Sequence, residues 1–229
     1  MMRIAGQTGG TPGQGRIGAN CGDLRVTDRR PCLRMRPAMA RSTEAFISAN
    51  MFDLGQGYVL FARFRGGEAE LGVFLVDVYC LGLKDAFYTR VREDEYEHRV
   101  LDRMLPPKNR KPLTPPSARR LVEDAVAYAQ NLGFTPHPDY KLACRVFGDT
   151  DADAASEKFA FGHQGKPYYV QGQSDSPEKC RHILRQLRTR CGEGNFNFLV
   201  VGGESVIEEW EREGFPGGPI PPVPPADLN

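Results

Sequence analysis

The feature of the sequence that most constrains its fold is the stretch GYVLFARFRGGEAELGVFLVDVYCLGLKDAFYTRV. It holds three β-rich runs, at 58–65, 70–80 and 85–91, which short glycine-containing connections separate. Such connections are typical of β-hairpins, so the three runs predict an antiparallel meander. The second run is apolar at both alternating sets of positions. This pattern predicts a central strand that is covered on both faces.

Two later stretches have the apolar spacing of amphipathic helices. In SARRLVEDAVAYAQNLG, apolar residues recur at intervals of three and four, and Gly133 is suited to end the helix. The second stretch is DSPEKCRHILRQLRTRCG, where we expect Asp175 to be the N-cap and Glu178 to complete a capping box. Both stretches therefore predict helices with one buried face.

Shorter elements complete the predicted order. We expect a helix at 93–105, a hairpin at 158–172 that turns between Gly162 and Gly165, a strand at 195–203 and a helix at 204–213. Strands and helices come partly in blocks, which favours an α+β fold over a doubly wound sheet. The expected architecture is an antiparallel β-meander with packed helices.

A single α+β domain is expected at 43–215, because the composition changes on either side of it. Residues 1–42 contain eight Arg, no Lys and two Asp, which is a net charge of +6. This segment is also rich in glycine and lacks apolar periodicity, so it predicts a disordered arm. Residues 216–229 contain six Pro, which predicts a proline-rich disordered tail.

The charge and hydropathy of the whole chain exclude two classes of protein. With 30 Lys+Arg against 29 Asp+Glu, the chain is not a wholly basic nucleic-acid-binding domain. No run approaches the ~18–20 apolar residues of a membrane span, so no membrane partner is expected. The start, MMRIAGQTGG, lacks the apolar core of a secretory signal, and the six cysteines form no CxxC pair. We therefore expect a cytoplasmic protein.

Asp77 is the most informative candidate for chemistry, because it is a carboxylate within the apolar run FLVDVYC. A buried charge is costly unless it is paired or binds a metal. RNase H-like nucleases carry a metal-binding carboxylate on a central strand, and Asp85, with Asp139 or Asp149, could complete a site for Mg²⁺ or Mn²⁺. The other interpretation is that Asp77 accepts hydrogen bonds or pairs with Lys84. No cofactor is predicted outside the metal alternative.

The tripeptide His137-Pro138-Asp139 follows the helix at 117–133 and matches the motif of J-domain co-chaperones. The preceding helix in those domains is basic, whereas this one is basic only at its start. The structural interpretation is that Pro138 begins a short helix and Asp139 stabilises its positive end. His137 is also a candidate general base.

A basic face is predicted on the helix at 176–191. Arg181, Arg185 and Arg188 recur there at intervals of four and three, and such a face could bind phosphates. Tyr168 and Tyr169 lie in the preceding segment and are suited to stack on single-stranded bases. The alternative is an ordinary solvated helix face.

Several motifs with defined chemistry are missing from the sequence. GDTDAD, at 148–153, resembles the start of an EF-hand loop, but the required glycine and the bidentate glutamate are absent. We therefore expect a capped turn there rather than a calcium site. The chain also has no GxSxG, no P-loop and no GxGxxG that opens a helix after a strand.

The stretches GVFLVDVYCLGLKDAF, LVEDAVAYAQNLGFTPHPDY and FGHQGKPYYVQGQSDSPEKCRHIL resemble a family of uncharacterised bacterial proteins. The resemblance covers about residues 43–200. It implies that this region is one natural domain and that residues 1–42 lie outside it. It implies no catalytic residue.

The sequence favours a non-catalytic cytoplasmic binding or accessory domain, whose partner is nucleic acid or another protein. The basic helix face and the absence of catalytic motifs are the basis of this expectation. The alternative is a metal-dependent nuclease or phosphodiesterase with a carboxylate site around Asp77. Whether the protein is an enzyme, and its oligomeric state, are left open by the sequence.

Overall fold

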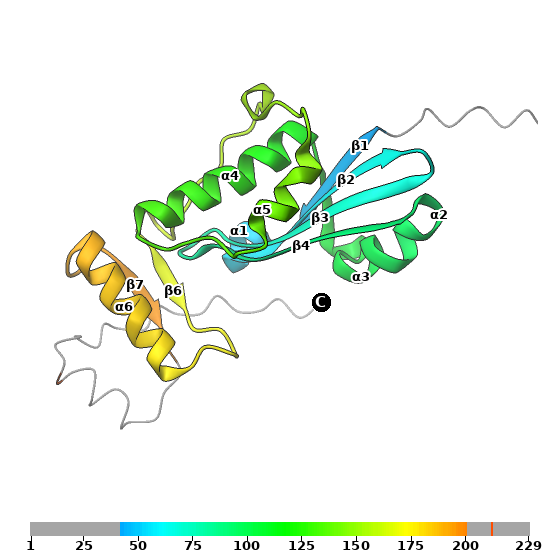
Figure 1. Cartoon of the computed structure of the whole chain (residues 1–229). Helices are drawn as coiled ribbons and strands as arrows, with labels where there is room; N and C mark the ends of the chain where they lie inside the picture. The colour runs from blue at the N-terminus through cyan, green and yellow to red at the C-terminus, as the bar shows by residue number, and fades with distance from the viewer. Residues whose placement is uncertain (1–41, 201–211, 213–229) are drawn as a thin grey trace, which may run out of the picture. The chain divides into compact units, whose positions relative to one another are not determined.

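The three β-rich runs form the centre of a five-stranded antiparallel sheet (Figure 1). A computed structural model describes residues 42–200 and Arg212. The strand order is β4-β3-β2-β1-β5, and all four neighbouring pairs are antiparallel. The strands are β1 (Thr43–Ser48), β2 (Gln56–Arg65), β3 (Glu68–Asp77), β4 (Gly82–Arg92) and β5 (Arg110–Leu113). The predicted α+β meander is thereby confirmed.

Strand β3 is central and buried on both faces, as its composition predicts. Phe74 and Val76 belong to the core on one face, and Leu71 and Val73 belong to the core on the other. Burial of each such side chain contributes about 1.5–3 kcal/mol to folding. Register with β4 shifts between Leu75 and Val76, so a bulge separates the two ends of this strand pair.

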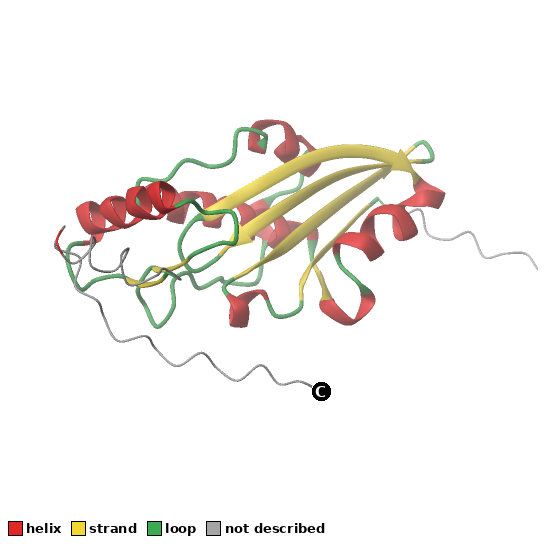
Figure 2. Cartoon of the chain, turned by 90° about the horizontal axis from the view of Figure 1, so that it is seen from below, coloured by secondary structure: helices red, strands yellow, loops and turns green. Residues whose placement is uncertain are grey.

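Helices cover both faces of the sheet. Figure 2 shows the helices in red and the strands in yellow. On one face lie α4 (Pro115–Asn131), α5 (Tyr140–Ala143) and the 3-10 turn Cys144–Phe147. On the other lies a continuous helical segment made of α2 (Glu93–Tyr96), the π-helical turn Glu97–Leu101 and α3 (Asp102–Met104). The short helix α1 (Met51–Leu54) joins β1 to β2, and a 3-10 turn (Pro107–Asn109) precedes β5.

Close contact between β4 and α4 depends on Gly82. Its φ is +63°, and a Cβ at this position would lie 2.4 Å from the carbonyl oxygen of Ala125. A side chain is therefore excluded both by the backbone conformation and by the approach of the helix. This contact places the start of β4, with Lys84 and Asp85, beside the C-terminal half of α4 and the connection that follows it.

A smaller αβ unit packs at one end of the sheet, as Figure 1 shows. It consists of β6 (Tyr168–Val170), α6 (Pro177–Cys191) and β7 (Asn197–Leu199). The amide of Tyr168 donates to the carbonyl of Tyr79 at 3.0 Å, which ties the unit to the turn after β3. Its core holds Leu132, Tyr169, Ile183, Leu184 and Leu187 together with three cysteines, Cys80, Cys180 and the half-buried Cys191.

The predicted hairpin at 158–172 is wrong. The turn between Gly162 and Gly165 closes with a single bridge, between His163 and Lys166. Strand β6 pairs instead with β7, in parallel, and α6 is the crossover between them. A parallel pair needs such a crossover, and a turn signal nearby in the sequence does not reveal it.

Two other predictions need correction. The strands β1 and β5 were not among the predicted elements. The N-cap of α6 is Ser176, whose hydroxyl accepts a hydrogen bond from the amide of Lys179 at 3.3 Å, and not Asp175. Asp175 lies one residue earlier and is buried.

The chain divides into two units, residues 1–37 and 38–229. The described residues all belong to the second unit. The predicted Arg/Gly-rich arm, the predicted helix at 204–213 and the proline-rich tail lie outside the described residues, except for Ser42 and Arg212. Among the described helices, none has the length and apolar composition that crossing a bilayer requires.

Candidate functional site

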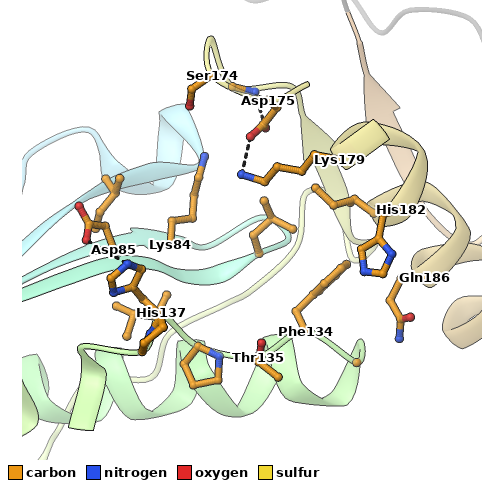
Figure 3. Close-up of a pocket in the computed structure, with 18 residues that line it drawn as sticks. Lys84, Asp85, Phe134, Thr135, His137, Ser174, Asp175, Lys179, His182 and Gln186 are labelled. Carbon is orange, nitrogen blue, oxygen red and sulfur yellow. Dashed lines mark hydrogen bonds and ion pairs between the residues drawn. The ribbon is translucent and has the colours of Figure 1, made fainter. Parts of the chain in front are cut away.

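A cleft of about 790 Å³ lies where the edge strand β4, the α4–α5 connection and α6 meet (Figure 3). Its apolar lining includes Leu81, Leu83, Phe134 and Ile183. Its polar lining comes from three separate segments and comprises Lys84, Asp85, Thr135, His137, Ser174, Asp175, Lys179, His182 and Gln186. An apolar surface with a few converging polar groups is the usual composition of a small-molecule site.

Two lysines project into this cleft. In Figure 3, the ammonium groups of Lys84 and Lys179 are directed toward the loop that carries Ser174 and Asp175. Lys84 Nζ donates to the side-chain oxygen of Gln56 at 3.2 Å, whereas Lys179 Nζ lies 2.6 Å from Asp175 Oδ1. The cleft therefore combines one ammonium that is bound to a carboxylate with one whose bonded neighbour is a neutral amide.

Asp175 connects the cleft to the core of the β6–α6–β7 unit. Its side chain is only 2% exposed, and Oδ2 accepts hydrogen bonds from the Tyr169 hydroxyl at 2.9 Å and the Gly172 amide at 2.8 Å. Burial alone would raise the pKa of this carboxyl, but the hydrogen bonds from Lys179, Gly172 and Tyr169 outweigh it and lower the pKa. Asp175 is thus a charged group that holds Lys179 in place.

His137 stands between two carboxylates at the opposite wall of the cleft. Its Nε2 lies 3.8 Å from Asp85 Oδ1, and its Nδ1 lies 4.0 Å from Asp139 Oδ2. Nδ1 also accepts the backbone amide of Asp139 at 3.3 Å, so in the neutral ring the proton belongs on Nε2, facing Asp85. The structure therefore brings together three of the five residues that the sequence offered as candidates for chemistry.

Asp77, the fourth candidate, lies apart from this group and is built into a turn. Its Oδ1 accepts the backbone amides of Tyr79 at 3.0 Å and Cys80 at 2.9 Å. Burial raises the pKa of the Asp77 carboxyl, and these backbone hydrogen bonds and the charge of Lys84 only partly offset it. The geometry matches the hydrogen-bonding interpretation given above.

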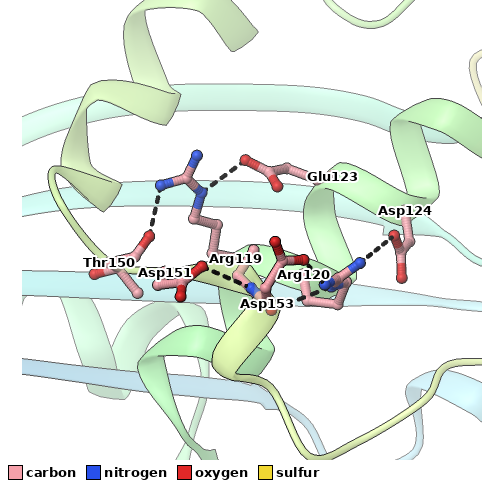
Figure 4. Close-up of polar contacts among 8 residues, drawn as sticks. Arg119, Arg120, Glu123, Asp124, Thr150, Asp151 and Asp153 are labelled. Atoms are coloured by element: carbon pink, nitrogen blue, oxygen red, sulfur yellow. Dashed lines mark hydrogen bonds and ion pairs between the residues drawn. The ribbon is translucent and has the colours of Figure 1, made fainter.

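Asp149 does not line the cleft and lies between the 3-10 turns Cys144–Phe147 and Ala152–Ala154. Figure 4 shows the polar contacts of the residues that follow it. There Arg119 donates to the Thr150 carbonyl at 2.6 Å, and Arg120 Nη2 lies 2.5 Å from Asp153 Oδ1. Asp151 caps the 3-10 turn Ala152–Ala154 by accepting the amide of Asp153 at 2.9 Å. The predicted capped turn is confirmed, and arginines of α4 hold it.

Within the described part of the chain, no group of three or more His, Cys, Asp or Glu is placed to hold a metal ion. Asp77 and Asp85 line different cavities, since Asp77 faces a smaller one beside Tyr79 and Tyr168. A role for Asp77 in binding Mg²⁺ or Mn²⁺ stays a prediction.

The predicted basic face lies on α6, away from the positions that line the cleft. Arg181 Nη2 is 3.5 Å from Glu178 Oε1, and Arg188 Nη2 is 3.7 Å from Glu193 Oε2. Arg185 is exposed. Acidic neighbours thus compensate part of the charge of this face, and its binding of nucleic acid stays a prediction.

The two tyrosines proposed for stacking have different surroundings. Tyr169 is fully buried, and its hydroxyl contacts Asp175 and, at 3.3 Å, Cys180 Sγ. Burial is the main reason that the pKa of Tyr169 is raised. Its ring therefore belongs to the core. Tyr168 is half-buried and lines the smaller cavity.

The sequence did not indicate that Lys84, Asp175, Lys179 and His182 line a common cleft. Lys84 was considered only as a partner for Asp77, Asp175 only as a helix cap, and Lys179 only as a neighbour of the basic helix face, while His182 was given no role. No local pattern marks these residues, because the walls of the cleft come from segments that are distant in the sequence. A buried acid four residues before a lysine on a helix is a weak signal for the Asp175–Lys179 pair.

The comparisons with known proteins gave no match. No family model, curated protein or solved structure matches the chain. The resemblance to a family of uncharacterised bacterial proteins is therefore untested.

Proposed function

We propose that the protein is a non-catalytic binding domain that holds a small organic anion, with a carboxylate or phosphate group, in the cleft. The observation that carries the proposal is the environment of Lys84. It is half-buried, and among the described residues no carboxylate lies within ion-pair distance of its Nζ. A partly buried charge is stabilised by a hydrogen-bonded partner of opposite sign, and an anion from solution would supply one.

Other properties of the cleft support the same proposal. Its volume of about 790 Å³ falls in the usual range of ~300–1,000 Å³ for small-molecule sites. Asp175 holds the Lys179 ammonium at the same side of the cleft, where its remaining N–H groups can donate hydrogen bonds to an anion. Thr135, Ser174 and Gln186 offer neutral hydrogen-bonding groups around it.

The test is the substitution Lys84→Met, which keeps the length of the side chain and removes its charge. We expect isothermal titration calorimetry with inorganic phosphate and with succinate to detect binding to the wild-type protein. Lys84→Met is expected to weaken binding of the preferred probe about tenfold, because a hydrogen bond to a charged group is worth about 1.5–3 kcal/mol.

The matched control is Lys111→Met. Lys111 is exposed and lies on β5, at the opposite edge of the sheet from β4. Equal weakening by both substitutions would mean that the anion responds only to net charge, and the proposed site would then be rejected. The same holds if neither probe binds the wild-type protein.

The same variants, together with Arg185→Gln, also test whether the protein binds nucleic acid. A gel shift with short single-stranded oligonucleotides, at two salt concentrations, reports on it directly. Binding that Arg185→Gln removes and Lys84→Met leaves intact would place the ligand on the basic face of α6. The small-anion proposal would then be replaced.

A further inference from the structure

A second, smaller cavity of about 110 Å³ adjoins the cleft. Gly172 lines both of them. Gln56 lines the smaller one, and its side-chain oxygen accepts the hydrogen bond from Lys84 Nζ at 3.2 Å. The Lys84 ammonium of the cleft is therefore hydrogen-bonded to a residue in the wall of the smaller cavity.

Aromatic rings form one side of the smaller cavity. Tyr79 and Tyr168 line it, with ring centroids 6.1 Å apart, and His163 packs against both at 5.0 and 5.4 Å. Tyr79 and Tyr168 are both half-buried. Tyrosine rings are side chains of the kind on which a planar ring stacks.

Tyr79 is fixed in position before any ligand binds. Its hydroxyl donates to the carbonyls of Phe52 and Asp53, at 2.8 and 3.0 Å. Its ring lies against Gly55, where a Cβ would come within 2.1 Å of the ring and φ is +78°. A ring held at both ends loses little freedom on binding, so it is a preorganised surface.

We propose that the anion of the cleft also carries a planar aromatic ring, as a nucleoside monophosphate does. The ring stacks on Tyr168 and Tyr79 in the smaller cavity, and the phosphate binds Lys84 and Lys179. This inference rests on the proposed function and adds a chemical class to it. The volume of about 110 Å³ is of the same order as the ~150 Å³ cavity that holds a benzene ring.

The test compares three probes on the wild-type protein by calorimetry: adenosine monophosphate, ribose 5-phosphate and inorganic phosphate. We expect adenosine monophosphate to bind at least fivefold more tightly than ribose 5-phosphate. Stacking of one base on an aromatic side chain accounts for a factor of about 5–150. This comparison needs no variant, so it is independent of any effect of mutation on folding.

Two substitutions test whether Tyr168 is responsible for the tighter binding of adenosine monophosphate. Tyr168→Leu is expected to reduce the preference for adenosine monophosphate over ribose 5-phosphate, because only Tyr79 then remains for stacking, while binding of ribose 5-phosphate is unchanged. Tyr168→Phe keeps the ring and is expected to retain the wild-type preference. Unchanged ribose 5-phosphate binding shows that the cleft of the leucine variant is intact.

The outcomes separate this inference from the proposed function. Equal affinity for adenosine monophosphate and ribose 5-phosphate would contradict the inference that the ligand carries an aromatic ring. The proposal that an anion binds in the cleft would be unaffected. A preference that Tyr168→Leu does not reduce would also overturn the inference about the ring. If none of the three phosphates binds, and succinate does not bind either, both proposals fail.

Discussion

Asp175→Ala is expected to lower the free energy of unfolding by about 3 kcal/mol. The substitution removes the acceptor of three donors: the Tyr169 hydroxyl, the Gly172 amide and the Lys179 ammonium. A buried donor left without a partner costs about 1–3 kcal/mol, and the Tyr169 hydroxyl would retain only its contact with Cys180 Sγ. Urea unfolding followed by circular dichroism measures the change.

Asp94→Ala is the matched control for this substitution. Asp94 pairs with Arg92 at 2.9 Å, but both side chains are largely exposed, so we expect a change within about 0.5 kcal/mol. If Asp175→Ala and Asp94→Ala had equal urea unfolding midpoints, the hydrogen bonds to the buried Asp175 carboxylate would add nothing to stability.

The same carboxylate predicts a dependence of stability on pH. The pKa of Asp175 is lowered in the folded protein relative to its ordinary value of 3.8, chiefly because the bonds from Lys179, Gly172 and Tyr169 overcome the effect of burial. Its contribution is therefore complete above the pKa of the unfolded chain and is lost as pH falls below about 4. Wild-type protein should lose more stability than Asp175→Asn between pH 5 and pH 3.

Asp77→Ala is the second substitution with a large expected effect, again about 3 kcal/mol of unfolding free energy. It leaves the amides of Tyr79 and Cys80 without an acceptor in the tight turn between β3 and β4. Asp77→Asn keeps an acceptor oxygen and removes a buried charge, so we expect a loss of less than about 1 kcal/mol. Urea unfolding of both variants measures the difference.

The pH dependence of Asp77 has the opposite sign to that of Asp175. Its pKa is raised by burial, so the folded protein takes up this proton at a higher pH than the unfolded chain does. The contribution of Asp77 to stability therefore increases as pH falls, and Asp77→Asn should lack that increase.

The substitution Asp77→Asn also tests the metal-dependent alternative. If Asp77 binds Mg²⁺ or Mn²⁺, the asparagine variant loses calorimetrically detected binding of the cation while its stability stays near that of the wild type. If Asp77 only supports the turn, the variant and the wild-type protein behave alike toward both cations. Equal stability of the alanine and asparagine variants would contradict the turn-supporting role.

Much of the fold could be predicted because the relevant signals are local. The β-rich runs of β2–β4 and the spacing of apolar residues in α4 and α6 depend only on near neighbours in the sequence. The strand β5 escaped prediction because its four residues, RKPL, include a proline and too few apolar positions. It is a strand because residues 45–48 of β1 pair with it.

The candidate site could be predicted only in fragments. Asp85, His137 and Asp139 were each named from the sequence, and the structure brings them together at one wall of the cleft. Lys84 and Asp175 were not connected to any ligand, because the opposite wall depends on where α6 packs. That position follows from the parallel pairing of β6 with β7, which has no local sequence signal.

The sequence by itself determined which segments are strands and helices around the central β3, because side-chain periodicity encodes which face of an element is buried. It also determined that a carboxylate, Asp77, lies inside an apolar run of residues. Only the tertiary structure decided that this carboxylate holds a turn and that the cleft forms elsewhere. Its walls join where Gly82 allows β4 to approach α4 and where the β6–α6–β7 unit packs on the turn after β3. Such long-range contacts arise from the shapes of packed surfaces, and periodicity within a segment carries no information about them.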